Sequence, residues 1–213
     1  MIKVILCDDH ALIRRGIRDT LSDASDIEVV GEAGDYGELR TLMRQPEFAC
    51  DVLVLDINMP GRSGLDVLHV LKDEGSPIKV LIVSMYPEDQ YAIRALRAGA
   101  YGYVNKGGDP QLLVQAVRTV AQGRKYVTPE IAQMLVESLT APITEQAHQK
   151  LSDRELQTLV MIASGKRLSD IAEELMLSPK TVSVYRARVL EKLGLANNSE
   201  LTVYAIRNGL VES

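Results

Sequence analysis

Four short apolar runs in the first half of the chain each end at a polar or charged residue. The runs have the character of β-strands, and each is followed by a side chain that can bind a ligand. These side chains are the pair Asp8-Asp9, then Asp56, Ser84 and Lys106. Because the carboxyl ends of parallel strands meet at one edge of an open sheet, where ligands bind, we expect these residues to lie together.

The segments between these runs have the periodicity of amphipathic helices. After Asp8-Asp9, for example, the apolar residues from Leu12 to Leu21 recur on one helical face. A further strand is predicted at 27–30, and further helices at 37–44, through 65–71, up to Gly99, and from Asp109-Pro110 to Gly123. Five strands alternating with five helices predict a doubly wound, flavodoxin-like parallel sheet covered on both faces.

The acidic residues at the predicted sheet edge favour a metal-assisted phosphoryl site. Asp8, Asp9 and Asp56 repel one another at close range, and a hard divalent cation such as Mg²⁺ relieves that repulsion through oxygen ligands. A carboxylate can then attack a phosphoryl group and form an acyl phosphate. Lys106 offers positive charge and Ser84 a hydroxyl for the phosphoryl oxygens. Asp56 is the best candidate nucleophile, because it stands alone at the end of the central strand.

The second part of the chain is predicted to be helical. Thr128-Pro129 begins a helix, and residues 140–149 lack an apolar period, so we expect an exposed, mobile linker there. Residues 152–155 form a capping box, and Ser178-Pro179 combines an N-cap with proline at the first helical position. Four helices, two of them joined by a tight turn at 176–178, predict an all-α helix-turn-helix domain. The sequence therefore predicts an α/β domain at residues 1–124, a helix and flexible linker at 125–149, and the helix-turn-helix domain at 150–213.

Charge is unevenly distributed between these parts. Residues 1–149 hold 15 basic and 21 acidic residues, a net charge of −6, whereas residues 150–213 hold 9 and 8, a net charge of +1. The helix expected at 179–193 carries four basic residues against Glu191 alone. That helix is the candidate surface for nucleic acid.

The remaining composition indicates an ordinary cytoplasmic protein. Cys7 and Cys50 are the two cysteines, and they suggest no disulfide framework. Cys7 lies inside a predicted strand and is better interpreted as a small buried residue than as a reactive thiol. The N-terminus has no signal-peptide pattern, and no apolar stretch approaches the roughly 20 residues of a membrane span.

The first 124 residues resemble the receiver domain of bacterial two-component response regulators. The matching segments are Asp8-Asp9-His10, residues 55–61, Val83-Ser84-Met85 and residues 104–107. The resemblance implies that a sensor histidine kinase phosphorylates Asp56. It also implies that Mg²⁺ is held by Asp9, Asp56 and the main-chain carbonyl of Asn58, with Asp8 in the same acidic pocket.

The same resemblance assigns roles to the other residues of the sheet edge. Ser84 and Lys106 are expected to bind the phosphoryl group, and Tyr103 occupies the position of an aromatic switch. A packed strand aromatic and a switch residue are compatible interpretations of Tyr103. The family couples such a two-state element to a distant surface, which here is expected to produce dimerisation or release of the DNA-binding domain.

Residues 151–210 resemble the helix-turn-helix domain of the NarL/FixJ, or LuxR-type, regulators. The matching segments are 151–156, Ile171-Ala172, 177–182 and 192–194. The resemblance implies a homodimer that places the 179–193 helix in the major groove of promoter DNA. The candidate DNA contacts are Lys180, Thr181, Ser183, Val184, Arg186, Ala187 and Arg188.

This chain departs from the family pattern at three of its positions. Lysine is frequent where Ser183 and Ala187 stand, so the operator sequence cannot be transferred from relatives. Arg167 stands where a Ser or Thr cap is usual, so we expect the helix that follows to begin less firmly. Ser183, Val184 and Ala187 can still meet bases, through a hydroxyl and through thymine methyl groups.

Two other functions remain open on the sequence alone. The chain could be a DNA-binding regulator that does not depend on phosphorylation. It could also be an α/β phosphatase or a nucleotide-binding enzyme that uses the acidic site for turnover. No glycine-rich phosphate loop follows the first predicted strand, and this favours a regulator over an enzyme.

Overall fold

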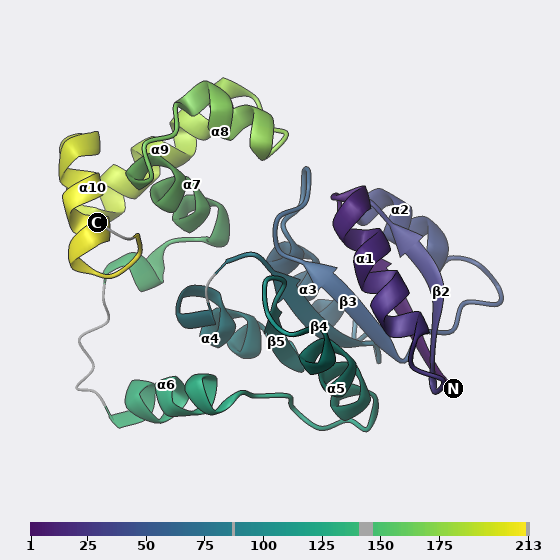
Figure 1. Ribbon diagram of the computed structural model, residues 1–213. Helices are drawn as coiled ribbons and strands as arrows, with labels where there is room; N and C mark the ends of the chain where they lie inside the picture. Colours follow the sequence, from purple (N-terminus) through teal and green to yellow (C-terminus); the bar gives the residue numbers. More distant parts are fainter. Residues whose placement is uncertain (87, 141–146, 212–213) are drawn as a thin grey trace. The chain divides into compact units, whose positions relative to one another are not determined.

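The computed structural model describes residues 1–86, 88–140 and 147–211, which form two compact units (Figure 1). The first unit spans residues 1–140 and the second 141–213. No helix among the described residues has both the length and the apolar character to cross a membrane.

A parallel sheet forms the centre of the first unit. Its strands are β1 (Ile2–Cys7), β2 (Ile27–Ala33), β3 (Val52–Asp56), β4 (Lys79–Ser84) and β5 (Gly102–Asn105). They lie in the order β2-β1-β3-β4-β5, which is the flavodoxin-like order predicted from the sequence. Every residue of β3 is buried, because helices cover both faces of this central strand.

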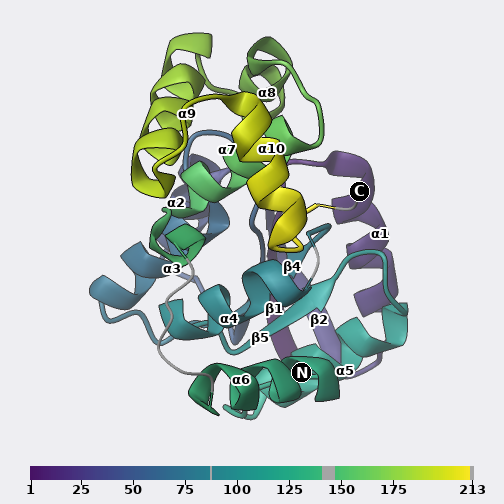
Figure 2. The same ribbon diagram turned by 90° about the vertical axis from the view of Figure 1, so that its left-hand side faces the viewer.

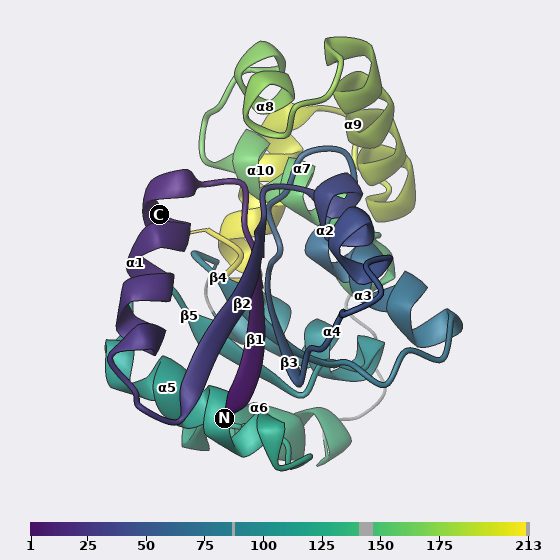
Figure 3. The same cartoon turned by 90° about the vertical axis from the view of Figure 1, so that its right-hand side faces the viewer.

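Five helices cover the two faces of the sheet. They are α1 (Ala11–Ser22), α2 (Tyr36–Met43), α3 (Gly64–Asp73), α4 (Glu88–Ala98) and α5 (Pro110–Ala121). Figure 3 shows α1 and α5 on one side of the strands and α2 and α3 on the other. The face toward α1 and α5 carries a continuous apolar core, in which strand residues such as Val54 and Leu81 pack against Leu113 and Val117 of α5. This packing fixes the strand ends that carry the polar residues.

Local signals set where these helices begin. The side chain of Ser63 accepts a hydrogen bond from the main chain of Asp66, whose carboxylate accepts one from Ser63 in return, so α3 starts with a capping box. Asp109 caps α5 immediately before Pro110. The sequence predicted the Asp109-Pro110 start, but the capping box at Ser63 was not anticipated.

A sixth helix, α6 (Pro129–Thr140), follows the receiver-like sheet. Tyr126 forms an isolated parallel bridge to Gly102 of β5, and α6 lies beside α4 (Figure 2). A Cβ atom at Gly102 would lie 2.9 Å from both the Cβ and the carbonyl oxygen of Tyr126. Glycine at this position therefore allows the chain after α5 to close against the edge strand.

The second unit consists of a short 3-10 helix and four α-helices. They are η1 (Ala147–Lys150), α7 (Asp153–Ala163), α8 (Leu168–Glu174), α9 (Pro179–Leu193) and α10 (Asn198–Arg207). Ser152 and Glu155 form the predicted capping box of α7, and Ser178 caps α9. Gly194 ends α9 with φ +66°, a left-handed conformation that glycine adopts without strain.

The structure differs from the expected linker at 140–149. Thr140 is the last residue of α6, and residues 147–149 belong to η1, while 141–146 lie outside the described residues. His148 is buried, and its main-chain amide and Nδ1 lie 3.2 and 3.0 Å from the hydroxyl of Tyr204 on α10. The prediction of exposure is therefore wrong for His148, because the lack of an apolar period gives no sign of its contacts with the distant helix α10.

The helix after Arg167 begins as the sequence suggested, with a weak cap. The Arg167 side chain makes no capping hydrogen bond. Its main-chain amide donates to the Asp170 carboxylate at 3.4 Å, near the upper limit for such a bond. One of the free amides at this helix start is therefore only loosely satisfied.

Candidate functional site

The register of the sheet brings Asp8 and Asp56 to neighbouring strand ends. Cys7 pairs with Leu55 across β1 and β3, so the next residue of each strand emerges at the same edge. This is the point where the strand order reverses direction, which is where open α/β sheets bind ligands. Both residues are buried: Asp8 is 4% exposed and Asp56 is 3% exposed.

Lys106 joins these two carboxylates. Its Nζ lies 2.7 Å from Oδ2 of Asp8 and 2.8 Å from Oδ2 of Asp56. The lysine side chain is 3% exposed, so its charge is held out of water and is neutralised by two acids. The residues that the sequence placed at three strand ends are therefore in direct contact.

The pKa of Asp56 is raised from the ordinary value of an aspartate to about 6. Burial is the largest cause, since it disfavours the charged form, and the nearby charge of Asp8 acts in the same direction. Lys106 lowers the pKa through its charge and its hydrogen bond, and a hydrogen bond with the main chain of Asn58 lowers it further. The carboxylate of Asp56 therefore takes up a proton more readily than an exposed aspartate does.

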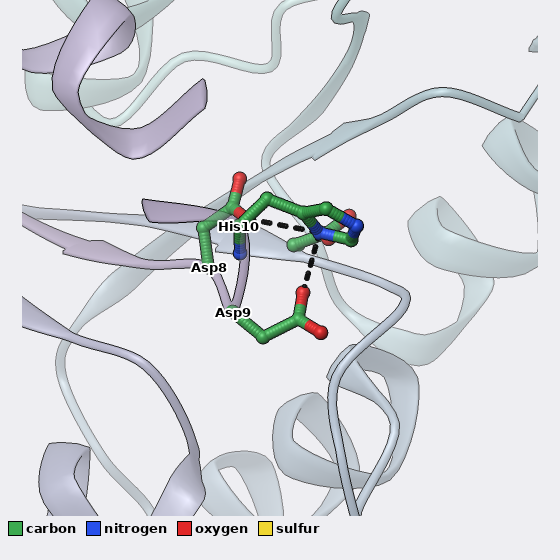
Figure 4. Close-up of side chains that lie close together, drawn as sticks. Asp8, Asp9 and His10 are labelled. Atoms are coloured by element: carbon green, nitrogen blue, oxygen red, sulfur yellow. Dashed lines mark hydrogen bonds and ion pairs between the residues drawn. The ribbon is translucent and has the colours of Figure 1, made fainter. Parts of the chain in front are cut away.

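Asp9 completes the acidic cluster from the loop before α1. Figure 4 shows its carboxylate facing the ring of His10, whose Nδ1 lies 2.7 Å from Oδ1 of Asp9 and 3.6 Å from Oδ1 of Asp8. One potential ligand atom from each of Asp8, Asp9, His10 and Asp56 lies within 4.8 Å of the others. His10 itself is half exposed at the surface of the cluster.

The donor set in this cluster fits Mg²⁺. Three carboxylates and the single charge of Lys106 leave a net charge of −2, which one divalent cation would balance. The side-chain Oδ1 of Asn58 is buried beside the site and has no hydrogen-bond partner among the described residues. Carboxylate and carbonyl oxygens are the ligands that Mg²⁺ prefers, so the residues present suit this ion.

Ser84 lies at the next strand end along the sheet. Asp56 pairs with Val83, so Ser84 follows one position further, and its carbonyl accepts a hydrogen bond from the main chain of Lys106 at 2.9 Å. The Ser84 hydroxyl accepts a hydrogen bond from the amide of Tyr86 at 3.2 Å, which leaves its own proton available to donate. Ser84 thus ends β4 and Lys106 directly follows the adjacent strand β5, both on the same side of Asp56.

Tyr103 connects this edge to the loop between β4 and α4. Its ring is completely buried, and its hydroxyl donates to the carbonyl of Tyr86 at 2.7 Å. The ring of Tyr86 stacks on that of Tyr91, with 4.7 Å between the ring centres. In this structure Tyr103 is therefore a packed core residue whose hydroxyl is tied to the loop that follows Ser84.

The second unit presents an exposed face of α9. Lys180, Ser183, Val184, Ala187 and Arg188 are exposed, at spacings that place them on one side of the helix. Within the described residues, neither Lys180 nor Arg188 has a hydrogen bond or ion pair to another side chain. Val182 and Val189 are fully buried on the opposite side, as the sequence predicted.

Other residues of α9 already have partners inside the unit. Nε of Arg186 donates to Oδ1 of Asn198 at 2.6 Å, and Nζ of Lys192 to Oε2 of Glu155 at 2.6 Å. The Thr181 hydroxyl lies 2.8 Å from that of Ser178. Lys180 and Arg188 are therefore the basic residues of α9 for which no side-chain partner is found within the described residues.

Three residues near the acidic cluster and Lys106 were given no role in the sequence analysis. His10 contacts both acids of the first pair, and Arg14 on α1 donates to the carbonyl of Asp8 and, at 3.1 Å, to the carboxylate of Glu32. The side chain of Asn105 bonds to Tyr86 and Gly107. The position of Asn105 one residue before Lys106 was a signal, but its partners are set only by the fold.

Comparison with known families covers both units. Residues 4–118 match the response regulator receiver domain, and residues 149–205 match the bacterial regulatory proteins of the luxR family. The chain belongs to the two-component response regulators of the NarL/FixJ type. This response regulator thus combines a receiver with a LuxR-type DNA-binding domain, in the order that the sequence predicted.

Full-length relatives support the same assignment. The response regulator is 40% identical over 213 residues to "Response regulator GacA" of Pseudomonas protegens, covering 100% of this chain and 99% of the relative. It is 40% identical over 211 residues to "Response regulator UvrY" of Escherichia coli K12, covering 99% and 96%. These relatives are named as response regulators and not as enzymes.

Solved structures of similar proteins have the same architecture. RcsB of Salmonella enterica serovar Typhimurium, solved with the promoter rprA and the phosphomimetic BeF3−, is 28% identical with a TM-score of 0.64, covering 95% of this chain and 97% of that one. The response regulator ChrA of a heme-sensing two-component system is 32% identical with a TM-score of 0.52, covering 99% of this chain and 98% of that one.

Proposed function

We propose that Asp56 accepts a phosphoryl group from a sensor histidine kinase, and that this modification controls dimerisation and promoter binding. The observation that carries the proposal is the contact of Asp56 with Lys106 at the point where the sheet order reverses. A buried carboxylate with a pKa of about 6, beside a lysine and two further acids, matches the needs of an acyl-phosphate site.

In the proposed transfer, one oxygen of Asp56 attacks the phosphorus of a phosphohistidine. The new P–O bond forms as the P–N bond breaks, and the electron pair of that bond stays with the imidazole of the kinase. Lys106 then turns from the carboxylates toward the phosphoryl oxygens, and the Ser84 hydroxyl donates to another of them. Asp9, Asp56 and the main-chain carbonyl of Asn58 would hold Mg²⁺, while Asp8 adds negative charge nearby. The ion would supply positive charge to the phosphoryl oxygens.

The switch in this proposal is the bond between Tyr103 and the carbonyl of Tyr86. When Ser84 moves toward the phosphoryl group, the Tyr86 amide that donates to its hydroxyl moves with it. That movement weakens the hold of the Tyr103 hydroxyl on the loop. A change in the preferred position of Tyr103 alters the surface formed by α4 and β5, and the dimer is favoured as a result.

A small phosphodonor tests the phosphoacceptor. Wild-type protein with Mg²⁺ and radiolabelled acetyl phosphate is expected to reach a plateau of one phosphoryl group per chain, and Asp56→Asn to take up none. Uptake by Asp56→Asn at the wild-type rate would contradict the assignment. Continued release of phosphate over many turnovers from a phosphorylated metabolite would instead favour the hydrolytic enzyme.

For the DNA-binding part, we propose that α9 enters the major groove of promoter DNA. Lys180 and Arg188 contact phosphates and position the helix. Ser183, Val184 and Ala187 face base edges, while Thr181 and Arg186 reach DNA only after giving up their present partners. Replacing Lys180 with Ala is expected to weaken binding to all sequences and to flatten the salt dependence by about one unit. An unchanged slope would remove Lys180 from the interface.

The proposed output is a homodimer on DNA in the bacterial cytoplasm, with a receiver at 1–124, a connecting segment at 125–149 and a DNA-binding domain at 150–213. Its test is the oligomeric state and the affinity for promoter DNA, measured with and without BeF3− and Mg²⁺. Dimer formation and tighter binding with the phosphomimetic are expected. Equal DNA affinity in both states would favour a regulator that does not depend on phosphorylation.

A further inference from the structure

The side chain of Asn105 links the two loops that carry the proposed phosphoryl-binding residues. Its Nδ2 donates to the carbonyl of Tyr86 at 3.3 Å, in the loop that follows Ser84. Its Oδ1 accepts from the amide of Gly107 at 2.8 Å, in the loop that follows Lys106. One short side chain therefore uses its donor toward one loop and its acceptor toward the other.

The main chain places Asn105 between these residues. Asn105 pairs with Ser84 in the ladder between β4 and β5, and it directly precedes Lys106. The carbonyl of Asn105 also accepts a hydrogen bond from Gly108 at 3.1 Å, which tightens the turn after Lys106. The main chain of Asn105 is therefore adjacent to both Ser84 and Lys106.

The two contacts need a side chain that carries both a hydrogen-bond donor and an acceptor. The partner in one loop is a carbonyl, which needs a donor, and the partner in the other is an N–H group, which needs an acceptor. An aspartate lacks the donor, and the apolar residues common in strands lack both. Asparagine supplies both groups in one rigid plane.

The same carbonyl of Tyr86 also accepts the hydroxyl of Tyr103, at 2.7 Å. If Tyr103 moves during the switch, the bond from Asn105 still holds the loop after Ser84 close to the loop after Lys106. We propose that Asn105 is a positioning residue, which keeps Ser84 and Lys106 in register while they capture the phosphoryl group. This inference rests on the proposed phosphorylation of Asp56.

If Asn105 acts in this way, its loss should change the affinity for a phosphoryl mimic but not the affinity for Mg²⁺. The proposed Mg²⁺ ligands lie in the loop after β1, at the end of β3 and in the loop after β3, and the Asn105 side chain bonds to Tyr86 and Gly107 instead. Loss of the amide is therefore expected to weaken capture of a phosphoryl mimic while leaving Mg²⁺ affinity unchanged. A residue that only supported the fold would lower both, together with the melting temperature.

The experiment uses the full chain and two variants, Asn105→Val, which suits a strand, and Asn105→Ala. Mg²⁺ alone is titrated by amide chemical shifts, and BeF3− is then titrated at saturating Mg²⁺ by ¹⁹F NMR. The apparent Kd for BeF3− is expected to rise about tenfold in both variants, with the Kd for Mg²⁺ within about twofold of wild type. Asn208→Ala is the matched control, because its amide bonds to Tyr204 in the other unit.

Two results would overturn the proposal for Asn105. One is wild-type affinity for BeF3− in the variants, and the other is an equal loss of Mg²⁺ and BeF3− affinity. Failure of the proposed function gives a different result, because Asp56→Asn would then bind BeF3− and take up phosphate as wild type does. Both Asn105 variants also remove the acceptor of the Gly107 amide, so faster hydrogen exchange at Gly107 confirms that the link is broken.

Discussion

The ammonium group of Lys106 lies 2.8 Å from a carboxylate oxygen of Asp56, and both side chains are almost completely buried. Burial makes this contact matter, because charge removed from water is stabilised chiefly by its immediate neighbours. The pair explains why the pKa of Asp56 is raised only to about 6, since burial and Asp8 raise it and Lys106 opposes them.

Asp56 is expected to make the Mg²⁺-free protein less stable as pH rises from about 4 to about 6. Its folded pKa lies above its unfolded value of 3.8, so the folded state binds more protons in this window. The stability that protonated Asp56 contributes to the folded state is present in full below pH 3.8, and it is lost as the pH rises through about 6. The free energy of unfolding of wild type, minus that of Asp56→Asn, should fall by up to about 3 kcal/mol. Urea denaturation of both proteins between pH 4 and 8 measures this, and a flat difference would be inconsistent with a raised pKa.

Gly64 is expected to tolerate no side chain. A Cβ atom there would lie 2.0 Å from the carbonyl oxygen of Asp56 and 2.8 Å from its carbonyl carbon, so the start of α3 and the end of β3 would have to separate. Gly64→Ala should lower the free energy of unfolding by about 3 kcal/mol or more and reduce phosphate uptake.

The matched control for Gly64 is Gly16→Ala in α1, where a Cβ would meet nothing within 4 Å. That change should be neutral or should stabilise the protein by up to about 1 kcal/mol, through helix propensity. Thermal and urea denaturation compare the two variants. Similar stability of both would mean that the close approach of α3 to Asp56 does not constrain the site.

Lys192 and Arg188 are expected to have opposite roles, although both are basic residues of α9. Lys192 pairs with the buried Glu155, and burial raises the pKa of that carboxyl, but the hydrogen bonds from Lys192 and Ser152 outweigh burial and lower it overall. Lys192→Met should cost about 1–2 kcal/mol of stability, because the partly exposed lysine leaves a buried carboxylate behind. It should leave the salt dependence of DNA binding unchanged.

Arg188→Met should give the reverse pattern. Its stability should stay within about 0.5 kcal/mol of wild type, and its salt slope for DNA binding should flatten by about one unit. Urea denaturation and DNA titration at several salt concentrations measure both properties in both variants. If Lys192→Met flattened the slope as well, the bond to Glu155 would have to open on DNA.

Met176 in the helix-turn-helix turn is expected to be strained. Its φ is +50°, where a side chain with a Cβ is disfavoured, and the residue is 66% exposed, so the long side chain gains little from packing. Met176→Gly should raise the free energy of unfolding by about 0.5–1 kcal/mol, after allowance for the greater freedom of glycine in the unfolded chain. Met176→Ala keeps the Cβ and is the control. Equal melting temperatures for the glycine and alanine variants would argue against strain.

The residues of the candidate site that lie at strand ends could be predicted from the sequence. Asp8, Asp56, Ser84 and Lys106 could be placed together because strand periodicity and the geometry of parallel sheets are local properties of the sequence. Partners at distant positions could not be predicted. The carbonyl of Tyr86 is shared by Tyr103 and Asn105, and no spacing in the sequence indicates that meeting.

In α9 too, the placement of the side chains could be predicted from the sequence, but their partners could not. Counting basic residues placed four positive charges on α9, but Arg186 and Lys192 bond to Asn198 and Glu155 within the unit. Helical periodicity gives the direction of each side chain, whereas the partners depend on which helices pack there. The error at His148 has the same origin, because its contact with Tyr204 joins residues 56 positions apart.

The sequence by itself determined the order of elements, the parallel sheet, the helix-turn-helix and the set of charged residues at the sheet edge. These follow from periodicity, caps and strand ends, which act over a few residues. The tertiary structure decided which charges meet, which are neutralised inside the protein and which remain for a ligand. Those outcomes depend on burial and on contacts between distant segments. The energy with which a charged group interacts is set by the atoms and solvent around it, and not by its position along the chain.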